Sequence, residues 1–229
     1  MEPLLAVDCG RVVYEEALRG QRLLHRARSE GAIGDVLLTL EHDRVYTAGR
    51  HADLASNVLG SRDIRVVEVE RGGDVTYHGP GQLVAYPIIE LPHAKAVRPF
   101  VEALEAACVR VAASYGIVAR AGSGGGQRRT GVWVGDQKLA AIGIKVDGRV
   151  TMHGLAFNVA PDLDDFGGIV PCGIADAGVC SLASLGQDAS MEEVRRRMVG
   201  ALAEALGRSV QQAHPQDLGL VRLEPDDAA

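Results

Sequence analysis

Residues 130–159 read TGVWVGDQKLAAIGIKVDGRVTMHGLAFNV, and this stretch decides the fold class. It holds three apolar runs, residues 132–134, 138–146 and 150–159, separated by Gly135-Asp136 and by Asp147-Gly148. Asp-Gly between two such runs indicates a β-hairpin, because a type I′ turn needs positive φ at both central residues. We therefore predict three consecutive antiparallel strands in this part of the chain.

Helices and further strands are expected on both sides of these hairpins. Apolar spacing predicts helices over residues 14–28 and 99–115, which end at Gly31 and Gly116. Ser190-Met191-Glu192-Glu193 has the form of a capping box and opens a last helix. Strands are predicted over residues 36–40, 64–69, 75–78 and 82–89, the last two as a β pair or one bent strand broken by Gly79-Pro80-Gly81. Without regular βαβ alternation, the fold class is α+β, with a mixed, largely antiparallel sheet and packed helices.

Length and charge limit the classes of function. The 229 residues indicate one domain, residues 1–207, followed by a polar tail, residues 208–229, that we expect to be partly disordered. The net charge of −6 disfavours nucleic-acid binding, which needs a basic footprint. The acidic N-terminal start is unlike a signal peptide and no apolar run is long enough to span a membrane, so a cytoplasmic protein is expected.

Three segments combine polar, reactive side chains with glycine: residues 71–82, 138–145 and 170–174. Glycine lets a ligand approach the backbone closely, and any one segment alone is equally well an ordinary turn. The glycine cluster at residues 122–126 lacks the Gly-Lys-Ser/Thr ending of a phosphate-binding loop and is interpreted as a flexible surface loop.

Cys172 differs from the other three cysteines, because it lies between a proline and a glycine in a loop. Cys9, Cys108 and Cys180 lie in or beside apolar runs and are interpreted as core residues. No Cys-x-x-Cys spacing occurs, so no metal site is expected. A thiol is only slightly ionised at pH 7 and needs a cation or base beside it, for which Lys138, His78 and His153 are candidates.

In this order, the motifs resemble those of the octanoyltransferases of lipoate biosynthesis. The resemblance covers about residues 5–207 and rests on Arg-Gly-Gly-Asp-Val-Thr-Tyr-His-Gly-Pro-Gly-Gln at 71–82, on the hairpin 131–143, and on Pro171-Cys172-Gly173-Ile174. It implies the fold of the catalytic modules of lipoate and biotin protein ligases. It also implies transfer of an octanoyl group from octanoyl-acyl carrier protein to a lysine of lipoyl domains or of the glycine-cleavage H protein, without a cofactor.

The resemblance also assigns roles to residues. It implies that Cys172 is the acyl-thioester nucleophile and that Lys138 activates it. The substrate-binding residues that it implies are Arg71, Gly72, Gly73, Asp74, Val75, Thr76, Tyr77, His78, Ala141, Ile142, Gly143, Gly154, Leu155 and Ala156. His78 and His153 stay open between a structural role and positioning of the thioester or the acceptor lysine, and a Cys-His dyad is the competing arrangement.

The chain has a net charge of −6, and acyl carrier proteins are themselves acidic, so the two should repel each other. We therefore expect a local rim of basic residues around the proposed site. Six residues flank the proposed segments and are candidates for it: Arg50, Arg71, Arg128, Arg129, Lys145 and Arg149. A local ion pair is expected between Arg71 and Asp74.

Two other functions compete with acyl transfer. An ATP-dependent lipoate or biotin protein ligase would share the fold, but it activates a free acid as an adenylate and needs no cysteine. A non-catalytic binder of lipoyl domains or carrier proteins would be expected to lose Lys138 or Cys172, and this chain keeps both.

Overall fold

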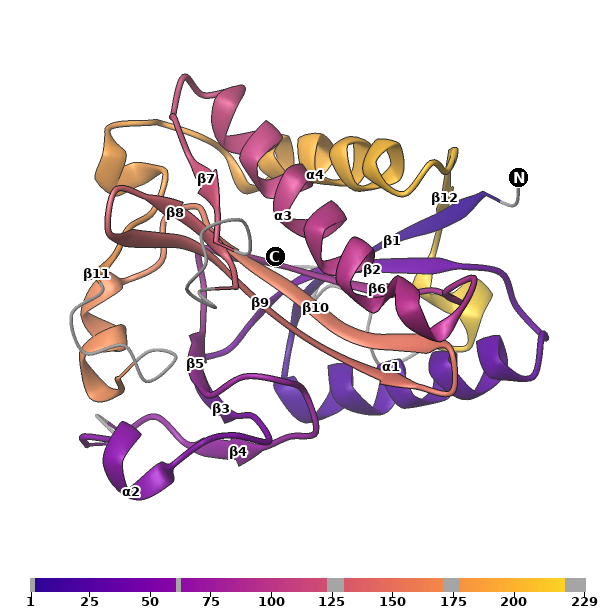
Figure 1. Cartoon of the computed structure of the whole chain (residues 1–229), viewed down its shortest axis with the longest axis horizontal. Coiled ribbons are helices and arrows are strands. Elements are labelled where there is room, and N and C mark those ends of the chain that lie inside the picture. The colour runs from indigo at the N-terminus through magenta and orange to yellow at the C-terminus, as the bar shows by residue number, and fades with distance from the viewer. Residues whose placement is uncertain (1–2, 61–62, 123–129, 171–177, 221–229) are drawn as a thin grey trace.

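The computed structural model describes residues 3–60, 63–122, 130–170 and 178–220. Within these ranges there are four α-helices: α1 (Tyr14–Ser29), α2 (Leu54–Asn57), α3 (Val97–Ala113) and α4 (Met191–Ala205). The strands are β1 (Leu4–Val12), β2 (Val36–His42), β3 (Val45–Ala48), β4 (Val66–Glu68), β5 (Val75–His78), β6 (Gln82–Ile88), β7 (Arg120–Ala121), β8 (Val132–Val134), β9 (Gln137–Asp147), β10 (Val150–Asn158), β11 (Gly178–Val179) and β12 (Val210–Ala213). Figure 1 shows their arrangement.

The described strands form a nine-stranded sheet and a three-stranded sheet. The large sheet has the order β12-β1-β2-β6-β10-β9-β8-β7, with β11 also paired to β9, and the small sheet has the order β4-β3-β5. In the large sheet β1 is parallel to β12 and β2, and β11 is parallel to β9, while all other pairs are antiparallel. The prediction of a mixed, largely antiparallel sheet is confirmed.

The two hairpins β8–β9 and β9–β10 are confirmed, but the predicted turn type is wrong. Val134 pairs with Gln137, so the central residues of the first turn are Gly135 and Asp136. In the second turn Val150 pairs with Asp147. Only the glycines at the first central positions, Gly135 and Gly148, have positive φ, of 58° and 60°. This is the pattern of a type II′ turn, in which only the first central residue needs positive φ.

The three long helices lie where the sequence predicts them. The side chain of Ser190 accepts a hydrogen bond from the backbone N–H of Glu193 (3.2 Å) and caps α4. The Glu193 carboxylate binds Arg197 one turn later (2.6 Å). α4 therefore begins with the predicted N-cap, and the glutamate of the capping box sequence forms an i,i+4 ion pair.

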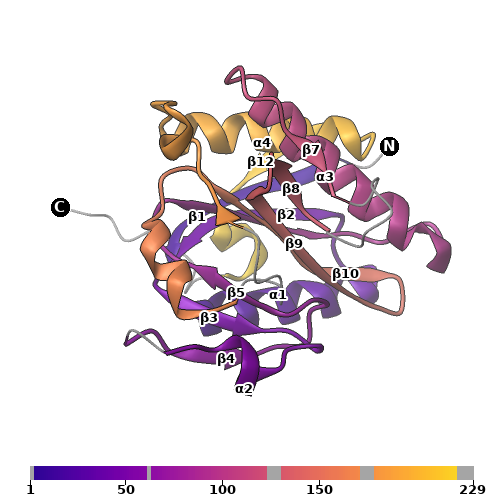
Figure 2. The same ribbon diagram turned by 60° about the vertical axis from the view of Figure 1, so that its left-hand side comes forward.

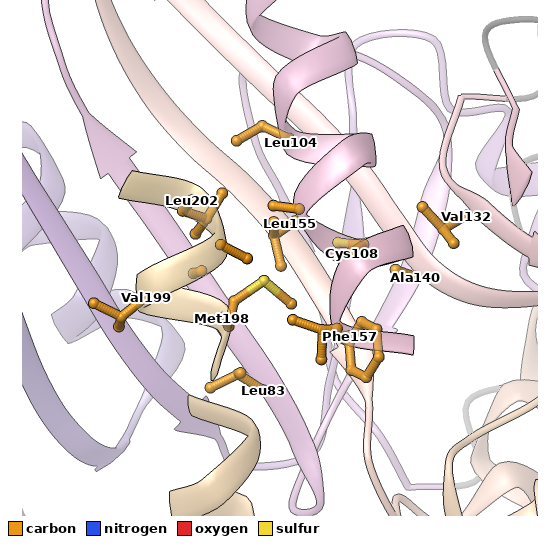
Figure 3. Packing of buried hydrophobic residues seen from close by; sticks show 14 of the residues in the cluster. Leu83, Leu104, Cys108, Val132, Ala140, Leu155, Phe157, Met198, Val199 and Leu202 are labelled. Carbon is orange, nitrogen blue, oxygen red and sulfur yellow. The ribbon is translucent and has the colours of Figure 1, made fainter. Parts of the chain in front are cut away.

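The helices cover the two faces of the large sheet (Figures 1 and 2). α3 and α4 pack against each other and against one face, where residues such as Leu83, Leu155 and Phe157 meet Met198 (Figure 3). α1 packs on the other face over β6 and β10. A smaller cluster, which includes Tyr14, Val45 and Met152, joins α1 to the small sheet and to β10.

One further expectation is wrong. β5 and β6 neither pair with each other nor form one bent strand, because β5 pairs with β3 in the small sheet and β6 pairs with β2 and β10 in the large one. Beyond residue 207, β12 extends the large sheet beside β1 and Leu220 is buried. No helix among the described residues has the length and apolar character needed to cross a membrane.

Candidate active site

The hairpin β9–β10 brings two of the predicted substrate-binding segments together. In its register Ala141 lies opposite Ala156, Ile142 opposite Leu155, and Gly143 opposite Gly154. From Leu155 onward β10 also pairs with β6, so the backbone N–H groups of this stretch are used within the sheet. This pairing disfavours these N–H groups as oxyanion donors.

The third segment, residues 71–78, lies against the same hairpin. The backbone N–H of Gly72 donates to the carbonyl oxygen of Ile144 (2.9 Å). A Cβ on Gly143 would lie 2.9 Å from the carbonyl oxygen of Gly72 and 3.2 Å from Cδ of Arg71. Glycine at position 143 therefore allows this close approach, because a real Cβ almost never tolerates such a contact.

A pocket opens where the three segments meet. Side chains and backbone of eleven of the predicted residues line it, and Tyr14, Tyr86 and His153 join them. Val75 and Tyr77 face away from it, into a separate cluster around Phe166, because side chains alternate along β5. The predicted residues in the lining are Arg71, Gly73, Asp74, Thr76, His78, Ala141, Ile142, Gly143, Gly154, Leu155 and Ala156.

Arg71 is a buried pocket residue, with 7% of its surface exposed, so its assignment to a basic rim is wrong. Its guanidinium donates to the carbonyl oxygen of Thr47 (2.6 Å) and to that residue's hydroxyl (2.9 Å). Asp74 instead accepts a hydrogen bond from the side-chain amide of Asn57 (2.7 Å). Arg71 and Asp74 thus bind other residues, and the predicted ion pair between them is not formed.

The other rim candidates are dispersed. Lys145 pairs with Glu70 and Asp147, and Arg149 pairs with Glu90 near the turn between β9 and β10. Arg50 is exposed, whereas Arg128 and Arg129 lie outside the described residues. The rim therefore stays a prediction that depends on Arg50 and on two residues outside the described ranges.

The two candidate histidines have different surroundings. Nδ1 of His78 lies 2.8 Å from Oε1 of Gln82. His153 has φ of 59°, an unusual value for a residue inside a strand, and its backbone N–H donates to Oε1 of Gln21 (2.7 Å). Its Nε2 is buried and has no hydrogen-bond partner among the described residues.

Both histidines are held neutral. Burial lowers the pKa of His153 to about 4, and the positive charge of Arg71 acts in the same direction. Burial also lowers the pKa of His78 well below its usual value, with a further contribution from His42. Among the described residues that line the pocket, Arg71 is the permanent cation and lies beside uncharged imidazole rings.

Lys138 lies near the start of β9, between two neighbouring strands. It pairs with Trp133 of β8 and with Val179 of β11. Its side chain is buried, with 6% of the residue exposed, and Nζ lies 4.7 Å from the centre of the Trp133 indole ring. Such a contact stabilises an ammonium group by about 0.5–2 kcal/mol.

Cys172 lies outside the described residues, but the chain on both sides of its segment is anchored near the pocket. The backbone N–H of Val170 donates to the carbonyl oxygen of Asn57 (2.9 Å), whose side chain binds the pocket residue Asp74. On the other side, Val179 is the β11 residue that pairs with Lys138. Val170 is thus hydrogen-bonded near the pocket, and Val179 pairs with β9.

The remaining cysteines are buried, as predicted. Burial raises the pKa of Cys9 to about 12 and that of Cys180 to about 11, and it raises the pKa of Cys108 as well. These three thiols stay protonated at neutral pH and are poor nucleophiles. Among the described residues, no group of three or more His, Cys, Asp or Glu side chains is arranged to hold a metal ion.

Comparison with known proteins identifies the family. Residues 13–203 match the model of the lipoyl protein ligase A/B catalytic domain. The chain belongs to this family. Within the lipoyl protein ligase A/B family, an octanoyltransferase of Chloroflexus aggregans is 46% identical over 212 residues, which are 88% of this chain and 94% of that protein. An octanoyltransferase of Nocardia farcinica is 41% identical over 211 residues, which are 89% and 82% of the two chains.

Solved structures share the fold at low sequence identity. A putative lipoate protein ligase from Thermoplasma acidophilum with bound lipoic acid superimposes with a TM-score of 0.74 at 15% identity, over 96% of this chain and 94% of that one. A lipoate-protein ligase A bound with ATP gives 0.74 at 16% identity, over 97% and 94%. These likenesses confirm the predicted lipoate ligase-like catalytic fold.

Proposed function

We propose that this chain transfers an octanoyl group from octanoyl-acyl carrier protein to a specific lysine of lipoyl domains and of the glycine-cleavage H protein. The observation that carries the proposal is the high identity to octanoyltransferases over most of the chain. The pocket is consistent with this proposal, because the pocket walls are largely apolar groups and glycine backbone of β9 and β10. Lys138 lies on the same strand, β9. Burial of an acyl chain is favourable by about 0.8 kcal/mol per methylene.

In the proposed route Cys172 attacks the donor thioester, a new C–S bond forms, and the carrier thiol leaves. The amine of the acceptor lysine then attacks the acyl-Cys172 thioester, a C–N bond forms, and the cysteine sulfur leaves. In the first half Lys138 takes the thiol proton of Cys172, stabilises the thiolate and passes the proton to the departing carrier sulfur. In the second half it takes a proton from the acceptor amine and passes it to the departing cysteine sulfur. Thioester exchange is nearly balanced and aminolysis is downhill, so no ATP is needed.

The experiment that tests this route is intact-mass measurement after incubation with octanoyl-acyl carrier protein. We expect one octanoyl adduct on the parent protein and none on the Cys172→Ser variant. Cys180→Ser is the matched control, because Cys180 is buried and should not carry the adduct. An adduct that persists in Cys172→Ser would show that another group is the nucleophile.

The same assay separates this function from an ATP-dependent ligase. Octanoylation of a lipoyl domain from free octanoate, dependent on ATP, would favour the ligase. Acyl transfer from the carrier protein in the absence of ATP supports the transferase.

A further inference from the structure

A continuous chain of hydrogen bonds connects the pocket residue His78 to the strand that carries Lys138. Nδ1 of His78 lies 2.8 Å from Oε1 of Gln82, and Nε2 of Gln82 donates to Oδ1 of Asn158 (2.9 Å). Nδ2 of Asn158 donates to the carbonyl oxygen of Cys180 (2.9 Å). The backbone N–H of Cys180 donates to the carbonyl oxygen of Lys138 (3.0 Å). His78 is thereby held in a fixed relation to β9 and β11.

Two backbone carbonyls determine the direction of every bond in this chain. The carbonyl oxygen of Cys180 can only accept, so the amide nitrogen of Asn158 faces it and Oδ1 faces Gln82. Nε2 of Gln82 must then donate to Asn158, and it also donates to the carbonyl oxygen of Tyr77 (3.2 Å). Oε1 of Gln82 is left facing His78, so Nδ1 of His78 carries the proton.

Nε2 of His78 is therefore an unprotonated acceptor on a residue that lines the pocket. Burial holds the ring neutral by lowering its pKa. Among the described residues, the hydrogen bond of the His78 side chain is the one at Nδ1. Nε2 can therefore accept a hydrogen bond from a molecule bound in the pocket.

His42 lies beside His78, but both of its ring nitrogens have hydrogen-bond partners. Its ring centre lies 5.6 Å from that of His78. Nδ1 of His42 donates to the carbonyl oxygen of Val12 (2.8 Å), and Nε2 accepts from the hydroxyl of Tyr86 (2.8 Å). His42 does not line the pocket, so it is a matched control for any experiment on His78.

We propose that Nε2 of His78 accepts a hydrogen bond from the amine of the acceptor lysine and orients it for attack, with Gln82 as the positioning residue that fixes the His78 tautomer. The inference rests on the proposed function, which supplies the acyl-enzyme and the amine. An unprotonated nitrogen repels a thioester carbonyl oxygen, so His78 does not serve as an oxyanion donor. With one N–H held by His78, the nitrogen lone pair faces the carbonyl carbon. The C–N bond forms as the C–S bond breaks, and the proton that the nitrogen loses passes by way of Lys138 to the sulfur.

The test measures the two half-reactions separately on the full chain. Acyl-enzyme formation from octanoyl-acyl carrier protein is followed by intact mass, and discharge of the isolated acyl-enzyme is followed with a lipoyl domain as acceptor. In His78→Phe, which keeps a ring but removes the acceptor, we expect acylation within about twofold of the parent. Discharge should slow at least about tenfold, the loss expected for one hydrogen bond to a reacting group.

Two further variants separate orientation from packing. Gln82→Met removes the acceptor that fixes the tautomer, so it should also slow discharge more than acylation. His42→Phe removes a neighbouring buried histidine and should leave the ratio of the two rates unchanged. A merely structural role of His78 would move both rates together in all three variants.

The inference is overturned if discharge by His78→Phe matches the parent. It is also overturned if acylation falls as much as discharge, because His78 would then serve the thiol or the acyl chain. Failure of the parent protein to form any acyl-enzyme would overturn the covalent route itself, and with it this step, so the two failures are distinguishable.

Discussion

At the scale of single residues, the pocket depends on the absence of a side chain at Gly143. The backbone of residues 71–73 reaches β9 only because position 143 has no Cβ. A Cβ there would lie 2.9 Å from the carbonyl oxygen of Gly72 and 3.2 Å from Cδ of Arg71. The hydrogen bond between Gly72 and Ile144 closes this wall. Arg71 and Gly73 line the pocket from the same segment, so the shape of the pocket follows from this one close approach.

We therefore expect Gly143→Ala to weaken acyl-donor binding. The added methyl group must displace Gly72 and Arg71, which should raise KM for octanoyl-acyl carrier protein severalfold and lower the free energy of unfolding by about 1–3 kcal/mol. Steady-state kinetics and urea unfolding measure the two effects. Gly200→Ala in α4 is the control, because an added Cβ there meets nothing within 4 Å, and the exchange should stabilise the protein by about 0.5–1 kcal/mol. Equal behaviour of the two variants would contradict the steric explanation.

The sequence predicts some residues of this site and misses others. Two of the three segments that local composition singled out, residues 71–82 and 138–145, contribute to one pocket, whereas residues 171–174 of the third lie outside the described residues. Tyr14 and Tyr86 could not be assigned, because each reaches the pocket from an element whose local pattern indicates only a helix or a strand. The left-handed backbone of His153 could not be predicted either, because it goes with a hydrogen bond from the N–H of His153 to the side chain of Gln21 in α1, which is distant in sequence.

At the scale of elements, hydrophobic patterns located most helices and strands but did not determine which strands pair. Gly79-Pro80-Gly81 marks a break between two strands, and local sequence cannot distinguish a hairpin from a crossing between sheets. In the structure the chain crosses here from the small sheet to the large one, and contacts distant in sequence hold this crossing. The N–H of Gly81 donates to the carboxylate of Glu41 (2.7 Å), and the carbonyl oxygen of Gly81 accepts from the N–H of Val159 (3.1 Å). β7 and β11 have two residues each and are too short to give any periodicity.

β12 is the clearest case of a strand hidden by its composition. Half of its four residues, Val-Gln-Gln-Ala, are polar and most are exposed, because β12 forms the edge of the large sheet. Pairing with β1 nevertheless satisfies backbone groups of residues 4–7. The chain beyond β12 then forms a short 3₁₀ turn, residues Pro215–Leu218, and buries Leu220 against the α1 side of the sheet.

Ending the chain after Gly207 should therefore destabilise the whole domain. Removal of β12 exposes the edge of β1 and the apolar surface that Leu218 and Leu220 cover. We expect Tm to fall by at least about 5 °C, measured by thermal unfolding, since about 1 kcal/mol shifts Tm by about 2–4 °C in a domain of this size. A chain that ends after Leu220 is the comparison, and the difference between the two truncations isolates residues 208–220. Equal Tm values would restore the view of these residues as a tail without a structural role.

At the scale of the whole molecule, the fold gathers buried histidines from separate elements at one place. His42 of β2, His78 of β5 and His153 of β10 lie around Tyr14 and Tyr86, where α1, the small sheet and the large sheet meet. Each ring is neutral because burial lowers its pKa. Folding therefore removes three sites that would bind protons readily in the unfolded chain.

This gathering predicts a loss of stability at mildly acidic pH. The pKa values of His42 and His153 are lowered to about 4, against about 6.5 in an unfolded chain. Above pH 6.5 both states are unprotonated at these rings and the effect vanishes. As pH falls from 6.5 towards 4, only the unfolded chain takes up the protons, so the free energy of unfolding decreases.

Urea unfolding at pH 7.5 and at pH 5.5 measures this dependence. We expect a decrease of at least about 2–3 kcal/mol, which is the part due to His42 and His153 at about 1.4 kcal/mol each per pH unit below the unfolded pKa. The lowered pKa of His78 adds to the decrease in the same direction. The window lies above the titration of ordinary carboxylates, so acidic residues contribute little to it. His42→Phe should have a lower stability at pH 7.5 but a flatter pH dependence, because one of the three proton sites is gone. A pH-independent free energy of unfolding in the parent would mean that these rings are accessible to protons in the folded state, and the closed aromatic cluster around the pocket would then have to open in solution.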